Sequence, residues 1–128
     1  MSKKILIADD APYIREIIRN ILSEENITFL PDACDGAEVV DLALKHQPDL
    51  IFMDLALPKK SGIDASAEIL ENLDHVRIVA ISSLHDSYMI QAALEAGCVD
   101  FIKKPFQVED ILQAVNYSEK SEKVASGE

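Results

Sequence analysis

The chain has few basic residues and no long apolar run. Its 12 Lys and Arg residues stand against 23 Asp and Glu residues, which gives a formal net charge of −11. Because phosphate backbones and anionic lipids are bound through basic patches, we expect neither nucleic acid nor a membrane surface as a partner. No segment approaches the ~20 apolar residues of a membrane helix. The first apolar run is also too short for a secretory signal.

Cysteine is scarce as well. The chain contains only Cys34 and Cys98, which are far apart and lack the CxxC spacing of metal and redox sites. We interpret both as small buried residues in a reducing compartment, and we expect a cytoplasmic protein. The length of 128 residues predicts one globular domain over residues 1–117. The polar segment 118–128 is expected to be a frayed or disordered tail.

Short apolar runs alternate with longer amphipathic segments, a pattern typical of βα units and a parallel sheet. The expected strands cover residues 5–8, 27–33, 50–53, 78–82 and 99–103. Five helices are expected. The first begins at Pro12, the next three cover residues 37–46, 61–72 and 87–96, and the fifth includes Val108 to Val115. Pro31 falls inside the second strand, and proline is tolerated in a sheet only at an edge. This favours the strand order 2-1-3-4-5, in which the second strand is an edge.

Acidic residues end two strands that this order makes neighbours. Asp9 and Asp10 follow the first strand, and Asp54 ends the third. Open α/β sheets bind ligands beyond the carboxyl ends of such strands. Carboxylates about 4 Å apart repel by roughly 4 kcal/mol per pair at an effective dielectric constant near 20, so the cluster needs a proton or a cation. Oxygen ligands at a half-open site favour Mg²⁺. The alternative, that Asp9 and Asp10 only cap a helix, is weaker because one acid would suffice.

Two further residues fit phosphoryl chemistry at this site. A carboxylate such as Asp54 can attack a phosphoryl group and form an acyl phosphate, while a cation and an ammonium offset the charge on its oxygens. Lys104 would supply the ammonium, and Ser82, which ends the fourth strand, would supply a hydroxyl. Taken alone, each could be an ordinary surface lysine or turn serine. The Lys104-Pro105 pair indicates a fixed turn, for which a cis peptide bond is one option.

Together these motifs resemble the receiver domain of two-component response regulators, and closely the stand-alone, chemotaxis-regulator (CheY-like) group. The resemblance covers about residues 3–117. It rests on Asp9-Asp10 after the first strand, on Asp54 followed by Pro58 and Gly62, on Ser82, and on Phe-Ile-Lys-Lys-Pro-Phe at 101–106. It implies a flavodoxin-like (βα)5 fold, a doubly wound five-stranded parallel sheet of order 2-1-3-4-5. Since this order is known for chemotaxis regulators, the fold expectation is not independent of the resemblance.

The resemblance also implies a role for each acid. Asp54 would accept a phosphoryl group from the phosphohistidine of a sensor histidine kinase. Asp10, Asp54 and the backbone carbonyl of Ala56 would hold Mg²⁺, and Asp9 would contact the ion through water.

The same resemblance implies a conformational switch. Lys104 would pair with the phosphoryl group, Ser82 would move towards it, and the Phe101 ring would turn inward. The face formed by the fourth helix, fifth strand and fifth helix would then change, and partners would read the change. Phe101 stands where chemotaxis relatives usually carry tyrosine. Ala56 and Leu84 offer no acid or amide to orient a water, so we expect slow autodephosphorylation.

The function implied is that of a single-domain signalling module, not an enzyme beyond its own phosphorylation and slow dephosphorylation. The favoured output is chemotaxis-type, through a flagellar switch protein. A phosphorelay intermediate that passes the group to a histidine phosphotransfer protein remains an alternative, as does a receiver domain excised from a larger regulator. We expect a monomer, with dimerisation on phosphorylation left open.

Three other classes fit the residues less well. A haloacid-dehalogenase-type phosphatase needs a second acid two residues after its nucleophile, and that position is Ala56. A flavin or nucleotide binder needs a phosphate-binding loop after the first strand, where Asp9 and Asp10 would repel a phosphate in the absence of a metal. A pure scaffold would not need the complete set of acids and lysine.

Overall fold

The structure, a computed structural model, describes residues 2–116; the tail expected at 118–128 lies outside this range. The strands are β1 (Lys3–Ala8), β2 (Ile27–Phe29), β3 (Leu50–Asp54), β4 (Arg77–Ser82) and β5 (Asp100–Lys103). The helices are α1 (Pro12–Ile21), α2 (Gly36–His46), α3 (Gly62–Asn72) and α4 (Ser87–Glu95). A further helix, called here the C-terminal helix, begins at residue 108 and is described through residue 116.

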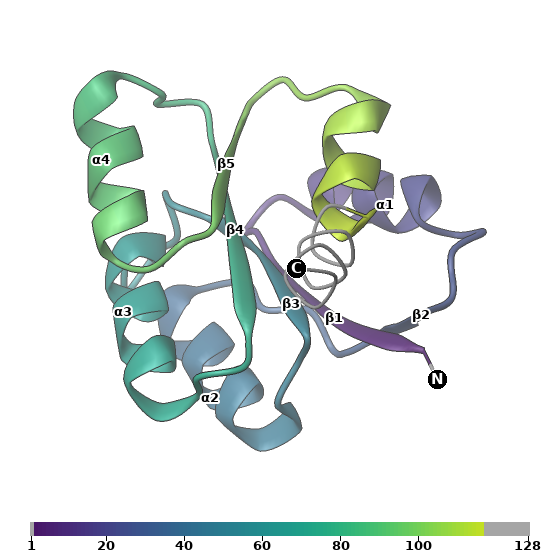
Figure 1. The fold of residues 1–128 in the computed structure, drawn as a ribbon, viewed down its shortest axis with the longest axis horizontal. Coiled ribbons are helices and arrows are strands. Elements are labelled where there is room, and N and C mark those ends of the chain that lie inside the picture. Colours follow the sequence, from purple (N-terminus) through teal and green to yellow (C-terminus); the bar gives the residue numbers. More distant parts are fainter. Residues whose placement is uncertain (1, 117–128) are drawn as a thin grey trace, which may run out of the picture.

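All strand pairs are parallel, and the order is β2-β1-β3-β4-β5 (Figure 1), which confirms the predicted fold class. The register places Ala8 of β1 opposite Met53 of β3, and Ile81 of β4 opposite Asp54. The carboxyl ends of β1, β3 and β4 therefore meet at one edge of the sheet. Side chains that follow these strands are brought together there.

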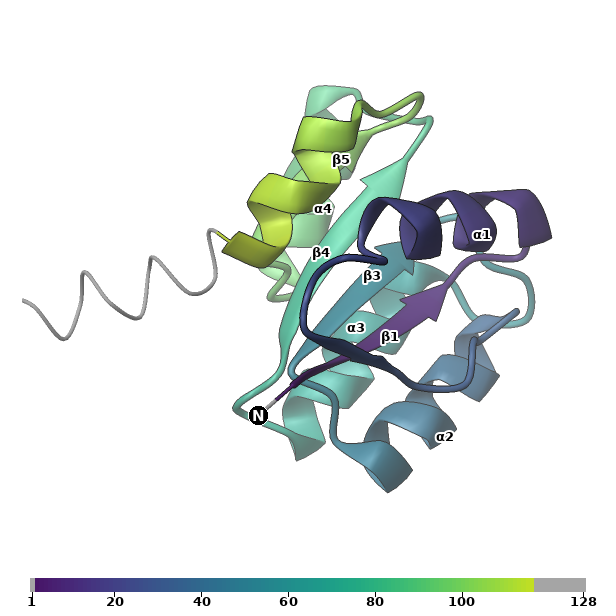
Figure 2. The same ribbon diagram turned by 90° about the vertical axis from the view of Figure 1, so that its right-hand side faces the viewer.

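The sheet is covered on both faces. The helices α2, α3 and α4 pack on one face, and α1 and the C-terminal helix pack on the other (Figures 1 and 2). The central strand β3 is buried throughout, with Ile51 and Met53 in the core beneath α2–α4 and Leu50 and Phe52 in the core beneath α1. This alternation follows from the two-residue period of a strand. A strand buried on both faces reads as a continuous apolar run, which is why β3 was visible in the sequence.

The second strand is shorter than predicted. It ends at Phe29, so Pro31 lies beyond it. The segment still follows β1: Leu30 N–H donates to the Ile5 carbonyl at 3.0 Å, and Ala33 N–H donates to the Ile7 carbonyl at 3.0 Å. From Leu30 to Ala33 the segment advances three residues while β1 advances two, from Ile5 to Ile7, so the pairing is irregular here. Pro31, which has no N–H to donate, lies in this irregular part. The predicted strand order was right, but the strand did not extend through the proline.

The prediction for cysteine was right for one residue and wrong for the other. Cys98 is buried, but Cys34 is exposed. Cys34 precedes α2 in a turn where its N–H donates to the Glu38 side chain, while the Asp35 carboxylate accepts the Glu38 N–H at 2.8 Å. This reciprocal arrangement resembles a capping box, which fixes the backbone of the turn rather than burying its side chains.

The start of α3 lies directly against the end of β3. Ser61 caps the helix by accepting the Asp64 N–H at 3.1 Å. Gly62 follows, and a Cβ added there would lie 2.3 Å from the backbone oxygen of Asp54. Only glycine permits this approach. Within residues 2–116 no helix is long and apolar enough to span a membrane.

Candidate functional site

Three carboxylates gather where β1 and β3 end. One carboxylate oxygen from each of Asp9, Asp10 and Asp54 lies within 4.8 Å of the others. Asp9 and Asp54 are buried, with 2% and 5% of their surface exposed, whereas Asp10 is open to solvent. The predicted acidic cluster is therefore assembled, with one exposed ligand and two buried ones.

The two buried carboxylates are held by backbone donors and by one ammonium group. Asp9 Oδ1 accepts the Ala11 N–H at 2.9 Å, and Asp54 Oδ1 accepts the Ala56 N–H at 3.1 Å. Lys104 Nζ lies 2.9 Å from Asp9 Oδ2 and 3.5 Å from Asp54 Oδ2. The lysine thus bridges the acids that end the two strands.

Lys104 reaches this position from just beyond β5. Its N–H donates to the Ser82 carbonyl at 2.9 Å, which continues the pairing of β4 with β5 by one residue. The following peptide bond, Lys104-Pro105, is cis, the option raised from the sequence. The lysine side chain lies over the carboxyl edge of the sheet, within reach of Asp9 and Asp54.

Burial and neighbouring charges both shift the pKa values of Asp54 and Lys104. Burial raises the pKa of Asp54; the Ala56 N–H opposes the rise, the charge of Asp9 adds to it, and Lys104 opposes it. Burial alone would lower the pKa of Lys104, but its contacts with Asp9 and Asp54 raise that pKa overall. Lys104 is therefore held as an ammonium ion, while the ionised form of Asp54 is disfavoured without further positive charge.

The donor set fits a magnesium ion. All the side-chain ligands are carboxylate oxygens, which hard divalent cations prefer, and exposed Asp10 leaves room for waters or phosphoryl oxygens. Burial, and to a smaller extent the charge of Asp9, raises the pKa of Asp54 even with Lys104 nearby, so the charged carboxylate would be stabilised by a further positive charge. A divalent cation at this edge would supply the missing positive charge.

Comparison with known proteins identifies the family. A model of the response regulator receiver domain matches residues 5–116. The chain belongs to this family. The receiver domain is 38% identical to the chemotaxis protein CheY of Bacillus subtilis (strain 168), over 91% of this chain and 97% of the relative. It is 34% identical, with the same coverage, to CheY of Thermotoga maritima.

A solved structure supports the same identification. The receiver domain matches a chain of the CheX–CheY–BeF3–Mg²⁺ complex from Borrelia burgdorferi with a TM-score of 0.83 and 29% identity, over 88% of this chain and 86% of that chain. Receiver domains generally bind Mg²⁺ at an acidic pocket, and the cluster of Asp9, Asp10 and Asp54 occupies that place here. The resemblance drawn from the sequence is thereby confirmed.

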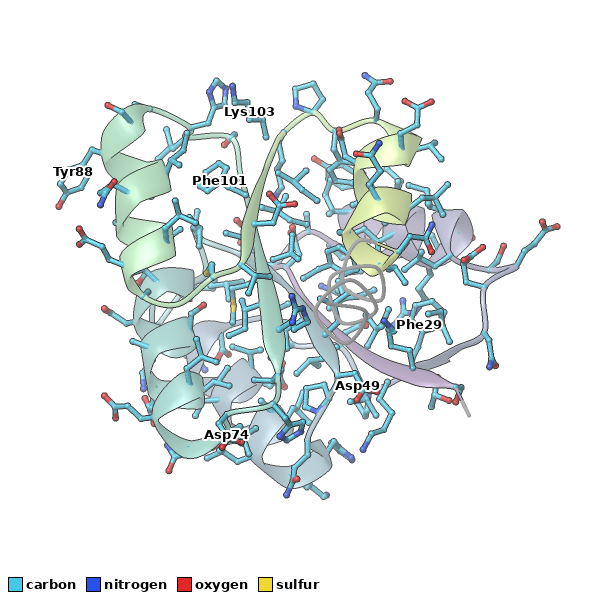
Figure 3. The ribbon with its side chains drawn as sticks, viewed as in Figure 1. Phe29, Asp49, Asp74, Tyr88, Phe101 and Lys103 are labelled. Atoms are coloured by element: carbon cyan, nitrogen blue, oxygen red, sulfur yellow. The ribbon has the colours of Figure 1, made fainter. Side chains whose placement is uncertain are left out.

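The two predicted switch residues of the receiver domain lie on neighbouring strands. Ser82 is buried at the end of β4, and its Oγ accepts the Leu84 N–H at 3.0 Å. Phe101 of β5 pairs with Ala80 of β4, and its half-buried ring lies between α4 and β5 (Figure 3). In the same view Tyr88 points away from the molecule on the outer side of α4. The ring of Phe101 is therefore neither fully buried nor fully exposed in this structure.

A charged network beside the site was not predicted. Arg15 of α1 donates through Nη1 to the Asp9 carbonyl at 2.7 Å and through Nε to Asp32 Oδ2 at 3.0 Å. Arg19, one turn later, also pairs with Asp32. Arg15 and Arg19 are four residues apart and share one face of α1, and such spacing within a helix gives no sign of a partner in the β2–α2 connection.

A cavity of about 590 Å³ opens next to the acids. Its lining comes from the start of α1, from Ser83 after β4, and from the turn that follows β5: Asp9, Asp10, Ala11, Tyr13, Ile14, Ile17, Ser83, Lys104, Pro105 and Phe106. Charged groups form one part of this lining and apolar side chains the rest. Asp9, Asp10 and Lys104 thus border a partly apolar groove, whereas Asp54 is not part of its lining.

Proposed function

We propose that this receiver domain is a phosphorylation switch in which Asp54 accepts a phosphoryl group from the phosphohistidine of a sensor histidine kinase. The observation that carries the proposal is the position of Lys104 Nζ, 2.9 Å from Asp9 and 3.5 Å from Asp54, within a cluster of three carboxylates. An ammonium fixed between two strand ends is suited to a group that brings its own negative charge.

The proposed transfer moves the phosphoryl group directly from the donor imidazole to Asp54. A carboxylate oxygen of Asp54 attacks phosphorus, a P–O bond forms, and the P–N bond to the donor imidazole breaks. The imidazole leaves with the electron pair of that bond and is neutral once its leaving nitrogen has taken a proton from water. The product is an acyl phosphate on Asp54, whose new negative charge faces Lys104.

The chain's own residues could hold the divalent cation that receiver domains use. Asp10, Asp54 and the backbone carbonyl of Ala56 would hold Mg²⁺, and Asp9 would contact it through water. When bound, Mg²⁺ offsets negative charge on the carboxylates and the phosphoryl oxygens. The negative charge of Asp54, which faces the ammonium of Lys104 in the structure, would then also face the cation, and so would the charge of exposed Asp10.

The proposed readout is a shift between two conformers. Ser82 Oγ, now bonded to the Leu84 N–H, would turn to a phosphoryl oxygen, and the β4–α4 connection would follow. The Phe101 ring would then turn inward and rearrange the face formed by α4, β5 and the C-terminal helix. Phe101 has no hydroxyl, so the readout would depend on the burial of its ring.

We further propose a chemotaxis-type output, which two CheY relatives that match nearly along their whole length support. The downstream partner would be a flagellar switch protein. The Borrelia burgdorferi relative was crystallised with CheX, BeF3 and Mg²⁺, so a partner that binds the activated state is a reasonable expectation here. A relay to a histidine phosphotransfer protein is the second candidate, favoured if the phosphoryl group is long-lived. Catalysis of other substrates is not proposed, and a cytoplasmic location stays a prediction.

Intact-mass spectrometry tests the phosphorylation site directly. Wild-type protein, Asp54→Asn and Asp10→Asn would be incubated with phosphoramidate, a small P–N donor, with Mg²⁺ or with a chelator. We expect the wild type to gain the mass of one phosphoryl group only with Mg²⁺, Asp54→Asn to gain none, and Asp10→Asn to respond weakly to the ion. Modification of Asp54→Asn at the wild-type rate would refute the assignment.

Partner capture tests the output. Immobilised protein loaded with Mg²⁺ and beryllofluoride, which stands in for the phosphoryl group, would be compared with unloaded protein and with Asp54→Ala in native lysate. A flagellar component captured only by the loaded protein would support motor control, and a histidine phosphotransfer protein would support the relay. Equal capture in all three samples would favour a scaffold.

A further inference from the structure

One arginine connects the acid cluster to two other elements. Arg15 is mostly buried, with 15% of its side chain exposed, and its planar guanidinium makes two bonds in different directions. Nη1 donates to the backbone carbonyl of Asp9, and Nε donates to Asp32 in the β2–α2 connection. A residue of α1 is thereby attached to the end of β1 and to the neighbouring loop.

The bond to the Asp9 carbonyl acts on the next residue. The Asp9 carbonyl and the Asp10 N–H belong to one planar peptide unit, so fixing the carbonyl fixes the start of Asp10. The other side of Asp9 is also held, because its N–H donates to the Ala33 carbonyl at 3.1 Å. In the described part of the chain, by contrast, no hydrogen bond or ion pair is made by the exposed Asp10 carboxylate. Among the described residues, the only restraint on Asp10 from this side is therefore the peptide unit whose carbonyl Arg15 binds.

We propose that Arg15 is a positioning residue for the divalent cation: by holding the Asp9–Asp10 peptide, it aims the Asp10 carboxylate at the site shared with Asp54. This inference rests on the proposed function, in which Asp10 is a ligand of Mg²⁺. Side chains that orient metal ligands without touching the metal typically contribute about 10–100-fold to metal affinity. Because Arg15 acts through a peptide unit rather than on a carboxylate, we expect the lower end of that range.

The sign of the effect separates positioning from simple electrostatics. A nearby guanidinium repels a divalent cation, so if Arg15 acted only through its charge, removing it would strengthen Mg²⁺ binding. If Arg15 positions Asp10, removing it would weaken binding although a repelling charge is gone. Arg19 provides the matched control because it also pairs with Asp32 but makes no bond to Asp9.

The experiment is a calorimetric titration of the full chain with MgCl2 after removal of metals by a chelator. The variants are Arg15→Ala, Arg15→Met, Arg15→Lys and Arg19→Ala, with Asp10→Asn to define the site. Thermal unfolding without Mg²⁺ is measured on each. Arg15→Met keeps the apolar stem of the side chain if Arg15→Ala does not fold.

We expect Arg15→Ala and Arg15→Met to raise the Kd for Mg²⁺ roughly tenfold, Arg15→Lys to fall between them and the wild type, and Arg19→Ala to change it less than about twofold. Arg15→Ala and Arg19→Ala should both lower Tm, because each loses an ion pair with Asp32, and Arg15→Ala should lower it more because it also loses the bond to the Asp9 carbonyl. Tighter binding by Arg15→Met, or equal losses of affinity in Arg15→Ala and Arg19→Ala, would overturn the inference. If the wild type and Asp10→Asn titrate alike, the proposed metal site itself is wrong.

Discussion

At the scale of single residues, the lifetime of a phosphoryl group on Asp54 depends on which side chains can direct a water towards it. Ala56 has its N–H bonded to Asp54 Oδ1, so its Cβ is fixed near the acceptor, but it carries only a methyl group. Leu84 has its N–H bonded to Ser82, and 60% of its surface is exposed. Neither side chain can accept a proton or orient a water. Slow autodephosphorylation therefore stays our prediction.

Replacing Ala56 with Glu or Asn tests it. A polar group at this position would lie beside the phosphoryl group, and a positioned acid or base contributes at least ~100-fold in favourable geometry. For an untuned substitution we expect a rise of roughly tenfold in the rate of phosphoryl loss, measured by the decay of the phosphorylated mass. Ala37→Glu adds the same charge as Ala56→Glu at an exposed position of α2 and should leave the rate unchanged. An unchanged rate in both Ala56 variants would contradict the explanation.

The residues that the sequence revealed are those whose position follows from strand ends. Asp9, Asp10 and Asp54 directly follow apolar runs, so strand order alone brought them together. Arg15 could not be recognised, because its partners are a backbone carbonyl and a loop residue whose placement depends on tertiary structure. The error at Cys34 has a similar cause: residue type favoured burial, but a helix-capping turn determined the exposure.

At the scale of elements, helix starts control the geometry of the site more closely than helix interiors do. The periodicity of apolar residues located the helices to within a residue or two, and the short β2 was misjudged because pairing continues irregularly past Pro31. The sequence could not show that the first residue of α3 rests on the backbone of Asp54. That contact depends on the distance between two elements, which no local pattern encodes.

Two adjacent substitutions at the start of α3 should therefore differ in effect. Ser61→Ala removes a cap and should lower the free energy of unfolding by about 1 kcal/mol. Gly62→Ala places a methyl group 2.3 Å from the Asp54 oxygen and 2.7 Å from Leu55 Cα, both backbone atoms that cannot easily yield. We expect a loss of about 2–3 kcal/mol from this overpacking, together with weaker Mg²⁺ binding, because Asp54 must shift. Urea unfolding and magnesium titration measure both; equal stabilities would contradict the close approach.

At the scale of the whole molecule, the acid cluster opposes the folding that assembles it. The raised pKa of Asp54 means that burial and the charge of Asp9 outweigh its bonds to Ala56 and Lys104. Lys104 lies closer to Asp9, at 2.9 Å, than to Asp54, at 3.5 Å, so it keeps a partner when Asp54 is neutralised. In a chelator at neutral pH, Asp54→Asn should therefore be more stable than the wild type by about 1–2 kcal/mol. Asp41→Asn, at an exposed position of α2, controls for the change in net charge.

The stability difference between the wild type and Asp54→Asn should depend on pH and on Mg²⁺. For a carboxyl whose pKa is raised on folding, the neutral form favours the folded state, so the deficit of the wild type is full above the folded pKa. It disappears as pH falls below 3.8, the ordinary pKa of an aspartate.

Mg²⁺ should reduce the same deficit at neutral pH. At ten times its Kd the ion stabilises the wild type by about 1.4 kcal/mol, while Asp54→Asn lacks one ligand and gains less. Thermal unfolding of both proteins at several pH values and Mg²⁺ concentrations measures how this stability difference changes. A wild type more stable than Asp54→Asn in chelator would mean that the bond to Lys104 outweighs burial, and that a cation is not needed to stabilise the charged acceptor.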